Sequence, residues 1–192
     1  MKKIGVLALQ GDFEAHGKAA ERAGAEVAYV RTASDLDGLD GLIIPGGEST
    51  TMLKLLNAEN MLEPLAEFGR KKPIFGTCAG AILLASRVSN PAQQSLGLVD
   101  LAIERNAYGR QIDSRVVNID AAPNFIERTG PGSIEAVFIR APIIREVGPK
   151  ARVLAEYDGD PVLVEEGQHL ISTFHPELTA DSRVHELFLS KL

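Results

Sequence analysis

The single cysteine of the chain lies in a sequence that is typical of a catalytic nucleophile. The segment Gly76-Thr77-Cys78-Ala79-Gly80 follows an apolar run and precedes helix-forming residues. A Gly-x-nucleophile-x-Gly segment between a strand and a helix makes a sharp turn that presents its central side chain. There the helix dipole favours a thiolate, and the backbone N–H of Ala79 can stabilise an oxyanion. The alternative is a buried structural cysteine between two packing glycines.

A histidine and a carboxylate near the C-terminus could complete a cysteine-based triad. The segment Thr173-Phe174-His175-Pro176-Glu177 ends an apolar run. A thiol nucleophile needs a base, for which His175 is suited, and a group that orients the base, for which Glu177 is suited. By itself this segment is more typical of a surface turn. The cysteine motif reverses that interpretation, because both segments follow predicted strands, where reactive groups of open α/β sheets collect.

A third segment, Pro45-Gly46-Gly47-Glu48-Ser49-Thr50, also lies between a predicted strand and a predicted helix. Adjacent glycines allow positive φ and leave backbone N–H groups exposed, so this loop can donate to an oxyanion or hold a carboxylate. The same residues suit an ordinary turn in which Ser49 or Thr50 caps the helix. No Gly-Lys-Ser/Thr follows, so the loop is not a Walker-type phosphate loop.

Arginines and histidines supply the remaining candidates. Residues 105–111 and 138–142 carry arginines that could recognise a carboxylate, although salt-bridged surface explains them equally well. His16, His169 and His185 have no Cys, Asp or Glu at metal-ligand spacing, so we expect no zinc site. We expect His16 on an exposed helix face, outside the catalytic set.

Strand and helix patterns alternate through the first half of the chain. Predicted strands cover residues 4–9, 26–31, 41–44 and 73–77, with helices at 13–23, after residue 49, at 61–70 and at 79–85. This order implies a mostly parallel sheet with helices on both faces and right-handed crossovers. The second half predicts short strands at 116–119, 136–139, 153–157, 161–165 and 169–174, a closing helix at 181–191, and no regular structure at 89–97. We therefore predict one α/β domain over residues 1–192, with an antiparallel elaboration in its second half.

Composition narrows the functional class. The 192 residues carry a formal net charge of −6, which argues against nucleic acid as the main partner. With one cysteine, no intramolecular disulfide can form. The apolar run at residues 4–9 is shorter than a signal-peptide core, which takes about 7–15 residues, so we interpret it as a core strand. No segment approaches the roughly 20 apolar residues of a membrane span, and we expect a cytoplasmic protein.

These motifs resemble those of class I, or triad, glutamine amidotransferases. Along nearly its whole length the chain is similar to one family among them, the glutaminase subunits of pyridoxal 5′-phosphate synthases. The matching segments are residues 5–12 with His16, 45–51, 76–80, 105–111, 138–142 and 175–178. The cysteine turn and the His-Pro-Glu segment identify only the superfamily. The Leu-Gln-Gly, Arg-Asn-Ala-Tyr-Gly-Arg-Gln and Ile-Arg-Ala-Pro segments indicate the subunit family.

The resemblance implies roles for the matching residues. Cys78 is the implied nucleophile, and His175 and Glu177 complete the triad. The implied glutamine site consists of Gly47, Glu48, Ser49, Arg105, Ile139 and Arg140. The implied oxyanion hole involves Gly47 and Ala79 and is organised by Gln10 when the partner docks. The family usually has Phe after Asp113-Ser114, where this chain has Arg115, so the resemblance does not define the local packing there.

The implied reaction hydrolyses L-glutamine to L-glutamate and ammonia through a glutamyl thioester. The implied partner is the synthase subunit, in a large hetero-oligomeric complex that uses the ammonia to make pyridoxal 5′-phosphate, vitamin B6. We expect no cofactor, metal, nucleic acid or membrane partner for this chain. Three alternatives remain from the sequence: a redox sensor or chaperone with a cysteine turn, a stand-alone peptidase or γ-glutamyl hydrolase, and an ammonia-donating subunit of another pathway.

Overall fold

The computed structural model describes residues 1–107 and 114–192 and contains three sheets. In chain order its elements are β1 (Lys3–Leu7), α1 (Phe13–Arg22), β2 (Glu26–Val30), η1 (Ala33–Leu36), β3 (Gly41–Ile44), α2 (Ser49–Ala58), α3 (Leu62–Lys71), β4 (Ile74–Thr77), α4 (Ala79–Leu84), β5 (Ala85–Ser89), β6 (Val99–Glu104), β7 (Ser114–Ile119), α5 (Pro123–Thr129), β8 (Ile134–Ile139), β9 (Ile143–Val147), β10 (Ala151–Tyr157), β11 (Asp160–Glu166), β12 (His169–Ser172), η2 (Pro176–Leu178) and α6 (Arg183–Leu189).

The central sheet has seven strands in the order β10-β11-β12-β4-β3-β1-β2. The pairs β12·β4, β4·β3, β3·β1 and β1·β2 are parallel, whereas β10, β11 and β12 pair antiparallel. This arrangement confirms the predicted mostly parallel sheet with an antiparallel elaboration. Because β1, β3, β4 and β12 run in one direction, the segments that follow them meet at the same edge of the sheet.

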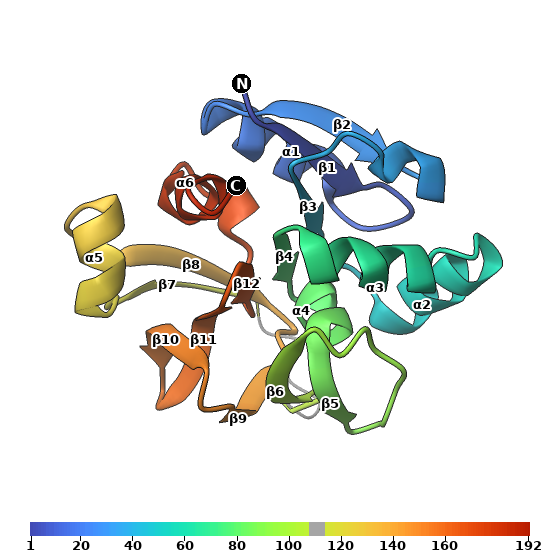
Figure 1. Cartoon of the computed structure of the whole chain (residues 1–192). Coiled ribbons are helices and arrows are strands. Elements are labelled where there is room, and N and C mark those ends of the chain that lie inside the picture. The colour runs from blue at the N-terminus through green and yellow to red at the C-terminus, as the bar shows by residue number, and fades with distance from the viewer. Residues whose placement is uncertain (108–113) are drawn as a thin grey trace.

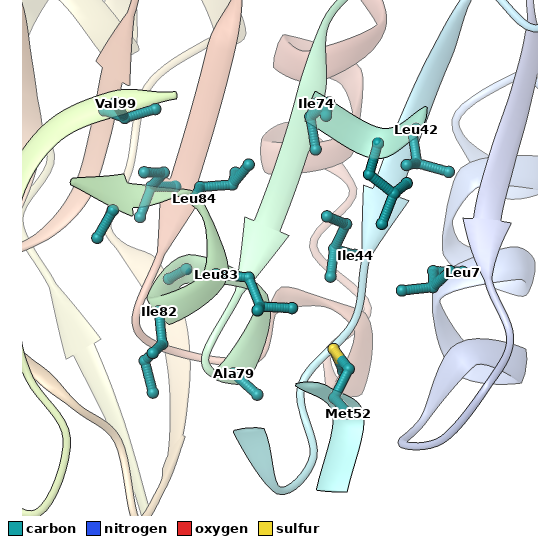
Figure 2. Close-up of a cluster of buried hydrophobic side chains, with 14 of the residues drawn as sticks. Leu7, Leu42, Ile44, Met52, Ile74, Ala79, Ile82, Leu83, Leu84 and Val99 are labelled. Atoms are coloured by element: carbon teal, nitrogen blue, oxygen red, sulfur yellow. The ribbon is translucent and has the colours of Figure 1, made fainter. Parts of the chain in front are cut away.

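Alternating strand residues divide the core into two layers, one on each face of the sheet. Leu42, Ile44 and Ile74 pack with residues of α2, α3 and α4 on one face, and Figure 2 shows part of this cluster. Ile43 and Phe75, the intervening residues, pack with α1, α5 and α6 on the other face. Figure 1 shows α1 and α6 on the side of the sheet away from α2 and α3. Both faces are therefore covered, as the continuous apolar runs predicted.

The second half of the chain departs from the prediction in several elements. The turn at Asp158-Gly159, with positive φ at both residues, joins β10 and β11 as expected. Four elements of the structure were not predicted: the strands β5, β6 and β9 and the helix α5. The strands β5, β6 and β9 form a separate three-stranded sheet, and β7 and β8 form a two-stranded one. β6 does alternate, with Val99, Leu101 and Ile103 buried between half-buried residues, so its pattern was a usable signal, whereas β5 and β9 show no such alternation. The predicted closing helix is α6, and residues 90–98 contain no helix or strand, close to the 89–97 predicted.

No helix in the described part of the chain is long and apolar enough to cross a membrane.

Candidate active site

A cavity of about 430 Å³ lies where the segments after β3, β4 and β12 meet. Its lining includes most of the residues selected from the sequence, and these selected residues come from five separate segments of the chain. The lining residues are Asp12, Gly46, Gly47, Glu48, Ser49, Cys78, Ala79, Ile82, Arg105, Asn106, Ile139, Arg140, Pro142, His175 and Leu178. Of the predicted site residues, only Gln10 and Glu177 lie outside this lining, each directly behind a residue that belongs to it.

Cys78 occupies the turn between β4 and α4 in a strained backbone conformation. Its φ of 50° and ψ of −105° lie outside the regions that a residue with a side chain ordinarily adopts. The flanking glycines allow the turn to close: a Cβ on Gly80 would collide with the carbonyl oxygen of Ile44, and one on Gly76 would lie 2.6 Å from the carbonyl carbon of Gly80. The backbone N–H of Cys78 donates to the carbonyl of Ser172, 2.9 Å away, which ties the turn to β12.

His175 and Glu177 follow β12 and lie beside Cys78. Nδ1 of His175 is 2.7 Å from Oε1 of Glu177, and the Glu177 side chain is fully buried. Burial lowers the pKa of His175, but hydrogen bonds to Cys78 and Glu177 and the negative charges of both groups outweigh it and raise the pKa to about 10. The raised pKa favours the imidazolium form of His175, which can give a proton to a leaving group.

The Gly46-Gly47 turn packs closely against the triad on one side and against the loop after β1 on the other. A Cβ on Gly46 would lie 2.6 Å from Cε1 of His175, and a Cβ on Gly11 would collide with the carbonyl oxygen of Gly46. A Cβ on Gly47, whose φ is 142°, would collide with Nε2 of Gln10. The Gln10 amide nitrogen is buried and has no hydrogen-bond partner within the described residues.

The N-terminus of α2 differs from the prediction that Ser49 or Thr50 caps it. Glu48 is the N-cap residue, because its carboxylate accepts hydrogen bonds from the backbone N–H groups of Thr50 and Thr51 at 3.1 and 2.6 Å and from Oγ1 of Thr51 at 2.7 Å. Burial raises the pKa of Glu48, but these hydrogen bonds lower it to about 2. The longer carboxylate satisfies two N–H groups, whereas a hydroxyl could accept from one.

The two arginines selected from the sequence, Arg105 and Arg140, both line the cavity and come from two separate segments, directly after β6 and β8. Nη2 of Arg105 donates to Oγ1 of Thr50 at 2.7 Å and lies 3.8 Å from Oε1 of Glu48. Arg140, with a φ of 44°, follows β8 and lines the cavity together with Ile139. The rest of the Arg105 motif, Tyr108 to Gln111, and Asp113 of the segment before Arg115 lie outside the described residues.

The expectation that His16 lies on an exposed helix face is wrong. His16 is fully buried on α1, with Nε2 at 2.9 Å from Oγ1 of Thr77 and Nδ1 at 3.1 Å from Nε2 of His185. The sequence carried a signal for this burial, because residue 16 shares a helix face with Ala19 and Ala20 at i+3 and i+4, and both are buried.

His16 also lies next to the triad, with Nε2 at 3.3 Å from Oε2 of Glu177. Spacing alone did not indicate that Thr77, His16 and His185 would form this buried group, since they come from three separate elements. Throughout the described ranges, no group of three or more His, Cys, Asp or Glu side chains is arranged to hold a metal ion.

Comparison with known proteins agrees with this geometry. Over the whole of both chains, the sequence is 64% identical to the pyridoxal 5′-phosphate synthase subunit PdxT of Solibacter usitatus. It is 50% identical to the subunit of the same name from Thermotoga neapolitana, over 97% of each chain. A crystal structure of a glutamine amidotransferase superposes with a TM-score of 0.88 at 43% identity, covering 98% of this chain and 97% of the other.

A more distant structure shares the fold alone. The structure of PurLQS from Thermotoga maritima matches with a TM-score of 0.73 at 19% identity, over 98% of each chain.

Residues 6–192, nearly the whole sequence, match the SNO glutamine amidotransferase family. With this match and the identities above, the chain belongs to the SNO glutamine amidotransferase family.

Proposed function

We propose that the chain is the glutaminase subunit of a pyridoxal 5′-phosphate synthase, and that residues 1–192 act as a single glutaminase domain. The observation that carries this proposal is the cavity in which Cys78 and His175 meet, with Glu177 bonded to His175 from behind. The relatives named as synthase subunits, at 50–64% identity over 97–100% of the chain, support the pathway.

In the proposed reaction, the Cys78 thiolate attacks the side-chain amide carbon of glutamine, and the carbonyl oxygen becomes an oxyanion. The imidazolium of His175 gives its proton to the amide nitrogen, the C–N bond breaks, and ammonia leaves a glutamyl thioester on Cys78. His175, now neutral, takes a proton from water as the water attacks the thioester. Cleavage of the C–S bond releases glutamate and regenerates the thiolate–imidazolium pair. Glu177 keeps its hydrogen bond to Nδ1 of His175 throughout and so holds the ring in orientation.

We infer that the α-amino-acid end of glutamine is held by the charged residues at the cavity rim. Arg105 and Arg140 present guanidinium groups suited to a carboxylate, and Ile139 contributes an apolar wall. Glu48 stays ionised, since its pKa is about 2, and its negative charge suits the α-ammonium group. Gly47 and Ser49 complete the proposed glutamine site.

The proposed oxyanion hole uses the backbone N–H groups of Ala79 and Gly47. Gln10 packs on Gly47, and its amide nitrogen is buried without a partner among the described residues. Such an unpaired group is costly, which supports a rearrangement of the Gly46-Gly47 peptide and the Gln10 loop when the partner docks. One missing oxyanion donor is worth about 10²–10³ in rate, so activation by docking should not exceed that range.

We propose that the partner is the synthase subunit, in a large hetero-oligomeric complex in the cytoplasm, without nucleic acid or membrane contacts. Free ammonia is protonated in water, so a docked synthase must receive it by a sheltered path. Ile139 and Leu178 line the cavity and still expose 37% and 42% of their surface, so a docked partner could cover apolar groups beside the active site.

The test measures ammonia release from glutamine by the chain alone and with the synthase subunit. We expect weak activity alone and activation by up to about 10³-fold in the complex. Cys78→Ser should abolish hydrolysis with an unchanged circular dichroism spectrum. Activity without activation, or cleavage of γ-glutamyl peptides in preference to glutamine, would support a stand-alone hydrolase. Wild-type turnover in Cys78→Ser would refute the proposed nucleophile. Normal activation of Gln10→Ala by the synthase subunit would refute the proposed rearrangement of the Gly46-Gly47 peptide and the Gln10 loop.

A further inference from the structure

We propose that His16 is a positioning residue for the triad: as a neutral imidazole, it directs its Nε2–H at the outer oxygen of Glu177 and so fixes the carboxylate that orients His175. The proposal deepens the proposed function and rests on it, because it assigns His16 a role in the same reaction. His16 does not line the cavity, and Glu177 is the triad residue that it contacts, so we expect its effect on the reaction to pass through Glu177.

The two oxygens of Glu177 have different surroundings. Oε1 is bonded to Nδ1 of His175 at 2.7 Å. Oε2 is buried and has no hydrogen bond of good geometry from the described residues, and Nε2 of His16 lies 3.3 Å away. A buried carboxylate oxygen without a donor is costly. A small movement of either side chain would turn this contact into a charge-assisted hydrogen bond, and His16 is in position to supply the donor.

The hydrogen-bond partners of His16 favour the required tautomer. If Nε2 of His16 carries the hydrogen, it points between Oγ1 of Thr77 and Oε2 of Glu177, and Nδ1 accepts from Nε2–H of His185. Nδ1 of His185, which has no partner in the described chain, then holds only a lone pair. In the opposite tautomer, His185 would bury an unpaired N–H, and a lone pair of His16 would face the carboxylate. Unpaired buried N–H groups are the rarer and costlier defect.

The surroundings also keep His16 uncharged. Burial lowers the pKa of His16 well below its ordinary value, and the positive charges of His185 and His175 lower it further. Burial and the charge of Arg22 lower the pKa of His185 to about 4. Glu177 is the acidic group that faces His16. A neutral donor can therefore hold the carboxylate without competing with His175 for its charge.

Aromatic packing fixes the ring of His16. Phe75 meets His16 edge to face with ring centroids 6.1 Å apart, and it meets His185 in the same way at 5.6 Å. The two histidine rings are 5.3 Å apart. His16 comes from α1, His185 from α6 and Phe75 from β4, so three elements of the core hold one imidazole in place. Such a ring can act as a rigid support for a side chain at the active site.

The test uses three substitutions of His16 and one control substitution of another buried histidine. His16→Gln carries an amide N–H that can reach the position of Nε2, whereas the amide of His16→Asn ends one bond short. His16→Leu removes all hydrogen bonding. His169→Leu is the control: His169 is also buried, and its Nδ1 accepts from the N–H of Ile74, at the end of β4 away from Cys78. Each His→Leu change leaves one buried N–H unpaired, so both should lower the melting temperature.

Glutamine hydrolysis in the complex with the synthase subunit gives the first readout. We expect kcat to fall about tenfold in His16→Leu and His16→Asn, as for loss of a hydrogen bond to a charged group, with KM within twofold of wild type. We expect His16→Gln to stay within threefold of wild type and His169→Leu to keep the wild-type kcat. If His16→Leu does not fold, the comparison of Asn with Gln decides.

Unchanged kcat in His16→Asn, equal losses in Asn and Gln, or an equal loss in His169→Leu would overturn the proposal. The rate of Cys78 alkylation by iodoacetamide at pH 7, measured on the free chain, gives a second readout that needs no glutamine. If the wild type hydrolyses no glutamine, the proposed function fails and alkylation decides the role of His16. We then expect Cys78 to be alkylated more slowly in His16→Asn than in His16→Gln. Equal alkylation rates in wild type and His16→Asn would refute the positioning role of His16.

Discussion

Glu177→Gln tests the carboxylate of the triad with little change in shape. The carboxylate is fully buried and 2.7 Å from Nδ1 of His175. Glutamine keeps the size of the side chain and a hydrogen-bonding atom but removes the charge. His175 then loses one of the two partners that stabilise its imidazolium, while its hydrogen bond with Cys78 remains.

The pKa of His175 sets the size of the effect. Burial lowers that pKa, but Cys78 and Glu177 together raise it from 6.5 to about 10. A rise of this size corresponds to roughly 5 kcal/mol in favour of the imidazolium. Cys78 contributes part of this figure; the loss of one buried hydrogen bond to a charged group, about 1.5–3 kcal/mol, predicts that Glu177→Gln lowers kcat/KM by roughly 10- to 150-fold.

The assay is glutamine hydrolysis in the complex with the synthase subunit, for wild type, Glu177→Gln and His175→Asn. We expect the loss in Glu177→Gln to fall mainly on kcat, because Glu177 does not line the cavity. His175→Asn should lose more, since it removes the group that transfers protons. Activity of Glu177→Gln within threefold of wild type, or a loss as large as that of His175→Asn, would refute these roles.

Three further predictions concern stability and binding. Because the pKa of His175 is raised to about 10, the stability that its charge contributes is fully present below about pH 6.5 and is lost as the pH rises through 10. In urea unfolding, the difference in stability between wild type and His175→Asn should therefore shrink across that pH range, and a constant difference would contradict the prediction. Arg105→Ala and Arg140→Ala should raise KM for glutamine, and unchanged kinetics in both would return these residues to a surface role. Gly80→Ala should lose more than about 2 kcal/mol through its backbone collision, against about 1 kcal/mol for Gly24→Ala, which meets no atom within 4 Å; equal melting temperatures would be the contrary result.

Local chemistry made much of the site predictable. The Gly-x-Cys-x-Gly turn could be identified from its residue types and spacing, although the contact that excludes a side chain at Gly80 comes from Ile44 of β3. His175 and Glu177 could be paired because only two positions separate them in the chain. The alternation of apolar strands with amphipathic helices predicted the parallel sheet, and with it the edge at which these segments would meet. Residue chemistry indicated the roles of Cys78, His175 and Glu177, whereas the glutamine-site residues and the role of Gln10 came from resemblance to a family.

Contacts between distant segments decided the rest. Arg105 reaches Thr50 across 55 positions of the chain. The cap of α2 is a local contact, from Glu48 to Thr50 and Thr51, but it uses a longer side chain than the usual Ser or Thr. The strands β5 and β9 have no alternating pattern of their own and form because β6 completes their hydrogen bonds.

The sequence by itself determined the nucleophile turn, its nearby His-x-Glu pair and the alternating core, because each can be recognised from the types and spacing of neighbouring residues. Only the tertiary structure decided the position of His16. Its helix face is apolar by sequence, but whether its imidazole contacts water or the triad depends on how α1 packs against β4 and α6. Burial there removed the solvent that would otherwise bond the imidazole, so Thr77, His185 and Glu177 became its neighbours.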